Sequence, residues 1–214
     1  MKTALIAGST GLIGGQLLST LLKSNYYDKV IAVGRRNLDI QHPKLIQQEI
    51  DFNNIGLNQQ NIDDVFCCLG TTMKKAGSKE KFRLVDFHYP VSLATYCLNL
   101  GAHQFLLVSS MGADNKSGIF YNQVKGEVEN AVSKLGYGRL DIFRPSLLLG
   151  NRGESRLGED IGKVAMRLFG FLFLGPLKNY KAIDSGKVAR AMINFAQESG
   201  AGTYFHLSAD LQKY

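Results

Sequence analysis

Cysteine and histidine are too few and too scattered in this sequence to build a disulfide framework or a metal centre. The three cysteines, Cys67, Cys68 and Cys97, are an odd number, and two of them are neighbours that cannot readily bridge. Free buried cysteines behave as small apolar side chains. None of them stands with one of the four histidines at the spacing of a ligand set. We therefore expect reduced thiols and no bound metal.

Long hydrophobic runs are also missing. The amino-terminal stretch M-K-T-A-L-I-A is interrupted at Gly8 after four apolar residues, which is too short for the core of an export signal. The uncharged run from Leu168 to Leu177 is about half the length that a membrane-spanning helix requires. Internal repeats and low-complexity linkers are absent as well. These absences predict a cytoplasmic protein without a membrane span.

Acidic residues are outnumbered by basic ones, and the formal net charge is +7 at pH 7. Part of this excess is a cluster that fits either a solvated helix face or contact with an acidic substrate, namely Lys74, Lys75, Lys79, Lys81 and Arg83. Nucleic-acid-binding proteins usually carry a recognised module beside such charges, and we find none here. We therefore expect no nucleic-acid partner.

Glycine, in contrast, is abundant near the amino terminus. An early stretch reads T-A-L-I-A-G-S-T-G-L-I-G-G, in which an apolar run ends at Gly8 and Gly11 and Gly14 open a helical pattern. Glycine turns tightly at positive φ and lets backbone N–H groups reach a diphosphate at the positive end of the next helix. The pattern predicts a strand over Thr3–Ala7, a phosphate-binding turn and a helix over Gln16–Lys23. The spacing differs from the common G-x-G-x-x-G fingerprint, so the turn alone is a weak signal.

Two arginines follow the second expected strand. The run K-V-I-A-V-G over Lys29–Gly34 leads directly into Arg35 and Arg36, and no acidic residue appears before Asp39. In a dinucleotide-binding sheet an acidic residue at this point binds the ribose 2′-hydroxyl, whereas arginine accommodates a 2′-phosphate. The pair therefore favours NADP over NAD as the cofactor. The alternative is a solvated basic pair at a strand end.

Apolar runs continue to alternate with helical patterns along the chain. Further strands are expected over Leu45–Ile50, Val65–Leu69, Gln104–Val108, Leu140–Arg144 and Thr203–Leu207. A further helix is expected from Asp184 through Ala196. Such alternation predicts an α/β fold of the Rossmann type, a doubly wound parallel sheet, in one domain that spans residues 1–214. We expect a small substrate region, residues 150–182, to be inserted in that domain.

A tyrosine and a lysine stand one helical turn apart after the fifth expected strand. That strand closes with Ser109 and Ser110, and the stretch Y-N-Q-V-K-G-E-V-E places Tyr121 and Lys125 on one helix face. A free phenol has a pKa of about 10, and a nearby ammonium lowers it by stabilising the phenolate. Such a tyrosine can exchange a proton with a substrate oxygen that a serine hydroxyl holds, while hydride moves at carbon. The alternative is an aromatic residue packed on the core beside a solvated lysine.

These motifs, in this order, resemble the short-chain dehydrogenase/reductases, in their atypical and extended branch. The motifs are S-T-G-L-I-G-G, R-R, D-F, C-L-G-T-T, S-S, Y-x-x-x-K and F-R-P-S-L-L-L-G. More narrowly, C-L-G-T-T, S-S-M-G-A-D, Y-N-Q-V-K-G-E-V-E and F-R-P followed by N-R-G-E-S-R resemble the Tat-interacting-protein-2-like group of small NADP-dependent oxidoreductases. The resemblance covers nearly the whole chain.

The resemblance implies roles for individual residues. Tyr121 would be the catalytic acid/base, Lys125 would bind the nicotinamide ribose and tune the phenol, and Ser110 would hold the substrate oxygen. The cofactor would be bound by Gly8, Ser9, Thr10, Gly11, Leu12, Ile13 and Gly14 along the diphosphate turn, by Arg35 and Arg36 at the 2′-phosphate, by Asp51 and Phe52 beside adenine, by Leu69, Gly70 and Thr71 under the ribose, by Tyr121 and Lys125, and by Pro145 and Ser146 at the nicotinamide end.

Two positions depart from the family pattern. Ser109 and Ser110 both lie near the expected serine, and alignment on the strand F-L-L selects Ser110. The family often has an asparagine at the start of the central helix, where this chain has V-D-F-H-Y-P around Asp86. The second departure puts any proton relay through that amide in question.

The sequence thus predicts an NADP-dependent oxidoreductase that transfers hydride between NADP(H) and the carbonyl or alcohol of a small substrate. An apolar stripe over residues 161–172 fits a pocket wall, a dimer contact or a membrane-surface helix, and Phe169, Phe171 and Phe173 suggest a partly apolar substrate. The alternative function is a non-catalytic NADP(H)-binding regulatory protein. A sugar-nucleotide enzyme is less favoured, because the carboxyl-terminal region is small. A homodimer is compatible with the sequence, and no membrane contact is expected.

Overall fold

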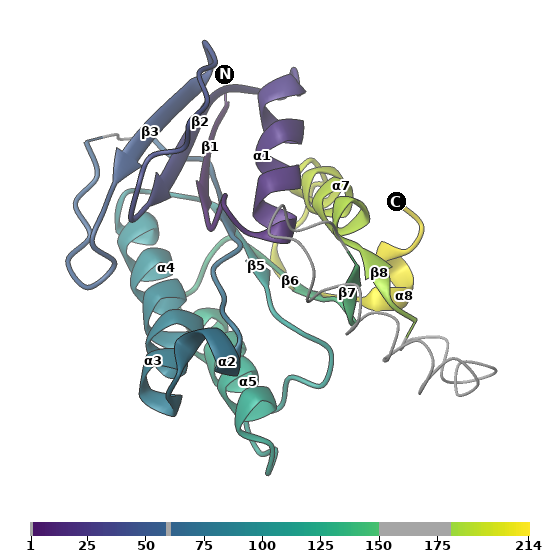
Figure 1. The fold of residues 1–214 in the computed structure, drawn as a ribbon. Coiled ribbons are helices and arrows are strands. Elements are labelled where there is room, and N and C mark those ends of the chain that lie inside the picture. The colour runs from purple at the N-terminus through teal and green to yellow at the C-terminus, as the bar shows by residue number, and fades with distance from the viewer. Residues whose placement is uncertain (1, 59–60, 150–180) are drawn as a thin grey trace.

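The described part of the chain is built around one parallel sheet. The computed structural model describes residues 2–58, 61–149 and 181–214. Strands pair in the order β3-β2-β1-β4-β5-β6-β9, and every pairing is parallel (Figure 1). Their bounds are Lys2–Ala7 (β1), Tyr27–Gly34 (β2), Leu45–Glu49 (β3), Asp64–Cys67 (β4), Gln104–Val108 (β5), Arg139–Arg144 (β6) and Gly202–Leu207 (β9). The predicted doubly wound α/β fold is confirmed, and its strand order reverses between β1 and β4, where such sheets bind ligands.

Helices cover both faces of the sheet. Helices α1 (Leu12–Lys23) and α7 (Ser185–Ala196) pack on one face, and α4 (Tyr89–Asn99) and α5 (Phe120–Ser133) pack on the other (Figure 1). Because the central strands are buried on both faces, they read as continuous apolar runs, such as A-L-I-A in β1, rather than as alternating patterns. Each face has its own hydrophobic core.

The predicted strands all occur, with shifted ends. Strand β5 has the predicted bounds, whereas β4 ends at Cys67. The Cys68 N–H still donates to the Ala7 carbonyl, and beyond it the Thr71 N–H donates to Asp86. Helix α1 begins at Leu12 rather than at Gln16, because the glycine-rich turn itself supplies the first helical residues.

A helical segment with a π turn follows β4. A short helix, α2 (Met73–Ala76), precedes α3 (Lys79–Arg83), which continues through the π-helical η1 (Leu84–His88) into α4. A π turn inserts an extra residue into a helix and occurs often at functional sites. Here it buries Asp86. The sequence did not predict this turn.

The carboxyl-terminal part returns to the sheet. Strands β7 (Leu148–Leu149) and β8 (Ile183–Asp184) form a separate parallel pair, and α8 (Ser208–Leu211) follows β9. Residues 150–180 lie outside the described residues, and with them lie the apolar stripe over 161–172, the run from Leu168 to Leu177 and nearly all of the predicted substrate region. Within the described residues, no helix has both the length and the apolar character to cross a membrane.

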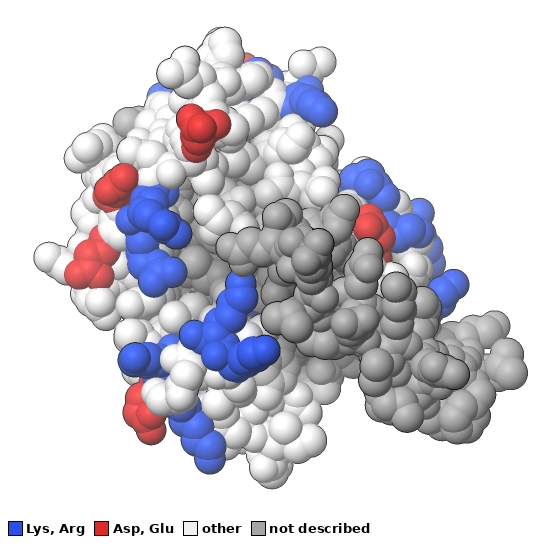
Figure 2. Space-filling model, in the orientation of Figure 1, with Lys and Arg blue, Asp and Glu red and all other residues white. Residues whose placement is uncertain are grey.

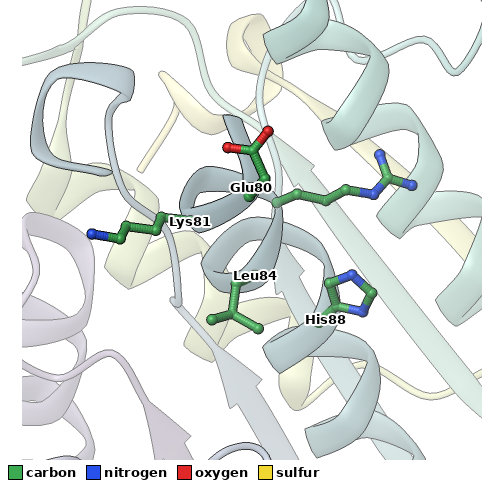
Figure 3. A pocket seen from close by; sticks show the side chains of 5 residues that line it. Glu80, Lys81, Leu84 and His88 are labelled. Carbon is green, nitrogen blue, oxygen red and sulfur yellow. The ribbon is translucent and has the colours of Figure 1, made fainter. Parts of the chain in front are cut away.

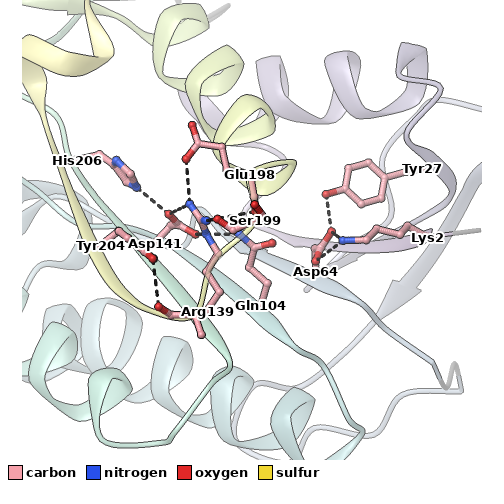
Figure 4. A network of polar contacts seen from close by, with 11 residues as sticks. Lys2, Tyr27, Asp64, Gln104, Arg139, Asp141, Glu198, Ser199, Tyr204 and His206 are labelled. Atoms are coloured by element: carbon pink, nitrogen blue, oxygen red, sulfur yellow. Dashed lines mark hydrogen bonds and ion pairs between the residues drawn. The ribbon is translucent and has the colours of Figure 1, made fainter.

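Two buried polar networks lie at or near the amino ends of the strands (Figure 4). Asp64, at the start of β4, pairs with Lys2 at 3.1 Å and accepts a 2.7 Å hydrogen bond from the Tyr27 hydroxyl. Asp141 in β6 is fully buried, and three nitrogens surround it at 2.8 Å, on Gln104, Arg139 and His206. Because these carboxylates are satisfied by their neighbours, we interpret both networks as structural.

Candidate active site at the carboxyl edge of the sheet

The glycine-rich turn packs closely against the end of β4. Gly8 has a φ of +87°, and a Cβ there would lie 2.4 Å from the Cys68 carbonyl oxygen. A Cβ on Gly14 would lie 2.1 Å from the Gly8 carbonyl oxygen. Both distances are far shorter than real contacts, so only glycine fits at either position. The turn therefore holds the start of α1 against the sheet edge.

The start of α1 has the properties of an anion site. Its N-cap, Gly11, provides no side-chain hydrogen bond, and the first turn contains no acidic residue. The first backbone N–H groups of a helix lack partners within the helix and carry its positive partial charge. Ile13 is buried in the core, and Thr10 is exposed. These features suit the phosphate that the sequence predicts at this turn, and the phosphate site stays a prediction.

Basic side chains gather beside this edge. Arg35 and Arg36 directly follow β2 and are exposed. Figure 2 shows Lys and Arg side chains around the end of β2 and over α2 and α3. A gathering of one charge sign raises the local concentration of anionic ligands.

The two residues predicted to flank adenine are placed differently from each other. Phe52 is buried and stacks on Tyr89 with 5.2 Å between ring centroids, so its ring belongs to the core. Asp51 is exposed and accepts hydrogen bonds from the backbone N–H and side-chain amide of Asn53.

The loop after β4 contacts an ion pair. Asp86 Oδ1 lies 2.8 Å from Lys125 Nζ, and Asp86 Oδ2 accepts a 2.8 Å hydrogen bond from the Thr71 N–H. A Cβ on Gly70 would lie 3.4 Å from Asp86 Oδ1 and 3.7 Å from Lys125 Nζ. The loop thus connects the glycine-rich turn to the buried face of α5.

Helix α5 carries three polar residues on one face. Tyr121, Lys125 and Glu129 are spaced four residues apart, and Lys125 and Glu129 are buried. Burial alone would lower the pKa of Lys125, but the negative charge of Asp86 and the neighbouring Tyr121 raise it above its ordinary value. Lys125 is therefore an ammonium at neutral pH, although it lies within the protein.

The two candidate serines have different surroundings. Ser109 donates a hydrogen bond to Glu129, whose carboxylate also pairs with Arg144. The Ser110 hydroxyl is buried, and no described residue hydrogen-bonds to it. A buried hydroxyl without a partner is uncommon and calls for an explanation such as a ligand.

The segment after β5 is packed against the start of α5. The Asp114 N–H donates to the Asn122 carbonyl at 3.0 Å, and a Cβ on Gly126 would lie 2.1 Å from the backbone nitrogen of Asn115. Met111 N–H donates to the Pro145 carbonyl at 2.9 Å. These contacts bring the segment of Ser110 beside the first turns of α5 and the end of β6. The side chain of Ser146 is hydrogen-bonded to the Lys181 carbonyl and to Ser208, rather than open.

Sequence reasoning missed Asp86, Glu129 and Arg144 as partners of predicted site residues. The signal for Glu129 was present, because it continues the four-residue spacing of Tyr121 and Lys125. Asp86 and Arg144 were visible only as parts of the motifs V-D-F-H-Y-P and F-R-P.

Two residues of the basic cluster after β4, Lys81 and Arg83, also line a separate hollow. A shallow hollow of about 430 Å³ opens on α3 and η1, and it is lined by Glu80, Lys81, Arg83, Leu84 and His88 (Figure 3). In Figure 3 the Lys81 side chain points away from His88, so the charged groups do not converge. Among the residues that the structure describes, no three His, Cys, Asp or Glu side chains are grouped as metal ligands.

The chain is similar to known proteins over most of its length. The profile of the NAD dependent epimerase/dehydratase family matches residues 4–129. Protein HTATIP2 of Rattus norvegicus is 39% identical over 207 residues, which cover 94% of this chain and 84% of the relative. The protein named "Protein FMP52, mitochondrial" of Candida albicans is 35% identical over 202 residues, which cover 90% of this chain and 87% of the relative.

Solved structures share the fold at low sequence identity. MoeE5 in complex with UDP-glucose and NAD superposes with a TM-score of 0.71 at 17% identity and covers 95% of this chain and 74% of its own. A short chain dehydrogenase family protein from Francisella tularensis gives a TM-score of 0.68 at 13% identity and covers 98% of each chain. At such identities these matches show the fold alone.

One expectation from the sequence is wrong. We expected a cytoplasmic protein, but the fungal relatives from Debaryomyces hansenii, Candida albicans and Meyerozyma guilliermondii are named as mitochondrial proteins. The expectation relied on the absence of an export signal, which carries no information about mitochondria.

The family match covers residues 4–129, and the two relatives cover at least 90% of the chain. This protein therefore belongs to the NAD-dependent epimerase/dehydratase family of short-chain dehydrogenase/reductase-type proteins.

Proposed function

We propose that this protein is an NADP(H)-dependent oxidoreductase that transfers hydride between the cofactor and the carbonyl or alcohol of a small, partly apolar substrate. One observation carries the proposal. The end of the sheet that bears the glycine-rich turn also bears a buried ammonium, Lys125, one helical turn from Tyr121. It bears as well the buried hydroxyl of Ser110, to which no described residue hydrogen-bonds.

The residues at this edge fit a phosphorylated dinucleotide. The backbone of residues 8–14 would hold the diphosphate at the start of α1, and the exposed Arg35 and Arg36 would meet the 2′-phosphate. Leu69, Gly70 and Thr71 would lie under the ribose, and Pro145 would lie at the nicotinamide end. When bound, the cofactor supplies or accepts the hydride.

Two side chains, Tyr121 and Lys125, would then control proton transfer to and from the substrate. Tyr121 would donate its phenolic proton to the substrate oxygen during carbonyl reduction and accept a proton from the alcohol during oxidation. Lys125 would bind the ribose hydroxyls and stabilise the phenolate by its charge. A positioned acid/base of this kind contributes about 10²- to 10⁴-fold to the rate.

Ser110 is the serine that we assign to the substrate oxygen. Ser109 already donates its proton to Glu129. The Ser110 hydroxyl has no described partner, so it is available to hydrogen-bond a ligand. A donor fixed at the reacting oxygen stabilises the charge that develops there.

Substitution of the phenol tests the proposal. We expect Tyr121→Phe to lower turnover of a carbonyl substrate by about 10²-fold or more while the affinity for NADPH stays within about twofold, because only the proton donor is removed. Turnover would be measured by NADPH absorbance over a panel of aldehydes and ketones. Ser110→Ala should also lower kcat, whereas Ser109→Ala should mainly lower thermal stability.

Two results would contradict the proposal that the protein is an oxidoreductase. Unchanged turnover in Tyr121→Phe would exclude the phenol as the acid/base. Tight NADPH binding without oxidation by any substrate of the panel would favour the non-catalytic NADP(H)-binding regulator instead.

A further inference from the structure

Asp86 is a buried carboxylate that two parts of the candidate site share. It lies in the middle of η1, and its side chain is not exposed. One of its oxygens meets Lys125 of α5, and the other meets the backbone N–H of Thr71 in the loop after β4, both at 2.8 Å. Three segments far apart in the sequence therefore meet at one side chain.

Both partners of Asp86 are hydrogen-bond donors. A carboxylate offers an acceptor oxygen to each of them, whereas a carboxamide offers one oxygen and one NH₂ group. An asparagine at position 86 would have to turn a donor toward either the Lys125 ammonium or the Thr71 N–H. The two contacts therefore favour an acid over an amide at position 86.

The negative charge of Asp86 compensates a buried positive charge. Lys125 is 5% exposed, and an ammonium at such a position is costly unless an opposite charge accompanies it. The titratable groups around it are Asp86 from η1, Tyr121 from α5 and Cys67 from β4. Burial raises the pKa of the Cys67 thiol to about 12, so this thiol is neutral. Asp86 is therefore the charged partner of Lys125.

The ion pair also lies directly beneath the loop that we place under the ribose. A Cβ placed on Gly70 would lie 3.4 Å from Asp86 Oδ1 and 3.7 Å from Lys125 Nζ. No side chain therefore separates the Gly70 backbone from the ion pair. A movement of Asp86 would shift the ammonium and the loop together.

We propose that Asp86 is a positioning residue of the cofactor site, which acts through Lys125 by fixing its charged amine beside the loop of residues 69–71. The inference rests on the proposed function, because it takes this edge as a nicotinamide-nucleotide site. Asp86 holds Lys125 in place and does not itself contact the cofactor.

A double-mutant cycle on NADPH binding tests this proposal. Asp86→Asn and Lys125→Met should each weaken binding by about tenfold or more, as expected for the loss of a hydrogen bond from a charged group. If Asp86 acts through Lys125, the double variant should bind no more weakly than Lys125→Met alone. Calorimetry suits the measurement, because the chain has no tryptophan to report binding by fluorescence. Multiplicative losses in the double variant, or unchanged binding in Asp86→Asn, would overturn the proposal.

Asp141→Asn is the matched control. Asp141 is an equally buried carboxylate with several partners, but it lies near the other end of the strands. We expect this variant to lose thermal stability while its NADPH affinity stays within about twofold. A comparable loss of affinity in Asp141→Asn would show that the effect of Asp86→Asn is a general loss of folding, and the proposal would fail.

A second measurement needs neither the cofactor nor a folded variant. In the wild-type protein at neutral pH, acetic anhydride should modify Lys125 at least about tenfold more slowly than the exposed Lys75, because the pair with Asp86 keeps the amine protonated and buried. Equal rates, measured by mass spectrometry of peptides, would show that the ion pair does not form. Failure of the wild-type protein to bind NADPH and NADH would instead contradict the proposed function, while the labelling result would still report on the pair.

Discussion

At the scale of single residues, one face of α5 organises the candidate site. Tyr121, Lys125 and Glu129 lie four residues apart, and each is matched to a different part of the molecule: the proposed substrate oxygen, Asp86 in η1, and Ser109 with Arg144 at the ends of β5 and β6. Buried polar groups need hydrogen-bond partners. The segments that supply partners to Lys125 and Glu129 therefore lie close to this face of α5. Among the described residues, Ser109 has a hydrogen-bond partner and the Ser110 hydroxyl has none.

The arginines after β2 make the cofactor preference testable at the same scale. Replacing Arg35 and Arg36 together by alanine should weaken NADPH binding by about 10- to 100-fold and change NADH binding by less than threefold, because only NADPH carries the 2′-phosphate. Thermal shifts with each cofactor would measure this, since a ligand stabilises the folded state by mass action. Lys75→Ala, also at an exposed basic position, is the control. A wild-type protein that NADH stabilises more than NADPH would refute the preference.

At the scale of elements, close backbone approach decides where the cofactor turn lies. The turn after β1 reaches the end of β4 because Gly8 and Gly14 have no side chain. The π turn η1 acts similarly, since the extra residue redirects one side chain of an otherwise regular helix toward the site. The glycine-rich turn and the π turn thus place functional groups at positions that a regular strand or helix would not reach.

Two neighbouring glycines of α1 should respond oppositely to alanine. Alanine normally stabilises a helix interior by about 1 kcal/mol relative to glycine. At Gly15 the added Cβ would make an ordinary contact at 3.4 Å, so Gly15→Ala should leave the melting temperature unchanged or raise it. At Gly14 the Cβ would lie 2.1 Å from the Gly8 carbonyl oxygen, so Gly14→Ala should cost about 2 kcal/mol or more and lower the melting temperature by about 4–8 °C. Calorimetry of the cofactor-free proteins would measure both; an equally stable Gly14→Ala would contradict the close approach.

At the scale of the whole molecule, the two ends of the sheet carry different groups of polar residues. The networks around Asp64 and Asp141 lie at or near the amino ends (Figure 4). The carboxyl ends lie beside the glycine-rich turn, Lys125 and Ser110, whose hydroxyl has no partner among the described residues. Parallel strands bring all their carboxyl ends to one edge, so the proposed catalytic groups gather there, away from the networks of Asp64 and Asp141.

The network around Asp141 makes acid stability testable. Burial opposes ionisation of Asp141, but hydrogen bonds from His206, Arg139 and Gln104 lower its pKa below the ordinary value. The folded protein therefore binds a proton at this carboxyl less readily than the unfolded chain does, so its stabilisation is complete above about pH 4 and is lost as the pH falls through the lowered pKa. Asp141→Asn should cost about 3 kcal/mol near pH 7. Urea unfolding from pH 3 to pH 7 should show the difference between the two proteins shrinking below about pH 4; a constant difference would contradict this assignment.

The sequence predicted much of the candidate site because the relevant signals are local. The four-residue spacing of Tyr121 and Lys125 predicts that they share a helix face. The place of Gly8 after an apolar run predicts a turn. Asp86 gave no such signal, since its partners Thr71 and Lys125 lie 15 and 39 residues away and the π turn breaks the helical period that would have oriented it. The cytoplasmic expectation failed for a different reason, because targeting is not encoded in the fold.

By itself, the sequence determined three local features: apolar runs long enough for the strands of a buried sheet, glycines where the chain must turn, and a helix with Tyr121 and Lys125 on one face. Only the tertiary structure decided which serine has no partner among the described residues, which carboxylate pairs with Lys125, and how closely the turn after β1 approaches β4. The physical reason is that periodicity and backbone freedom act over a few neighbouring residues. The pairing of buried polar groups depends instead on segments that become neighbours only when the sheet has formed.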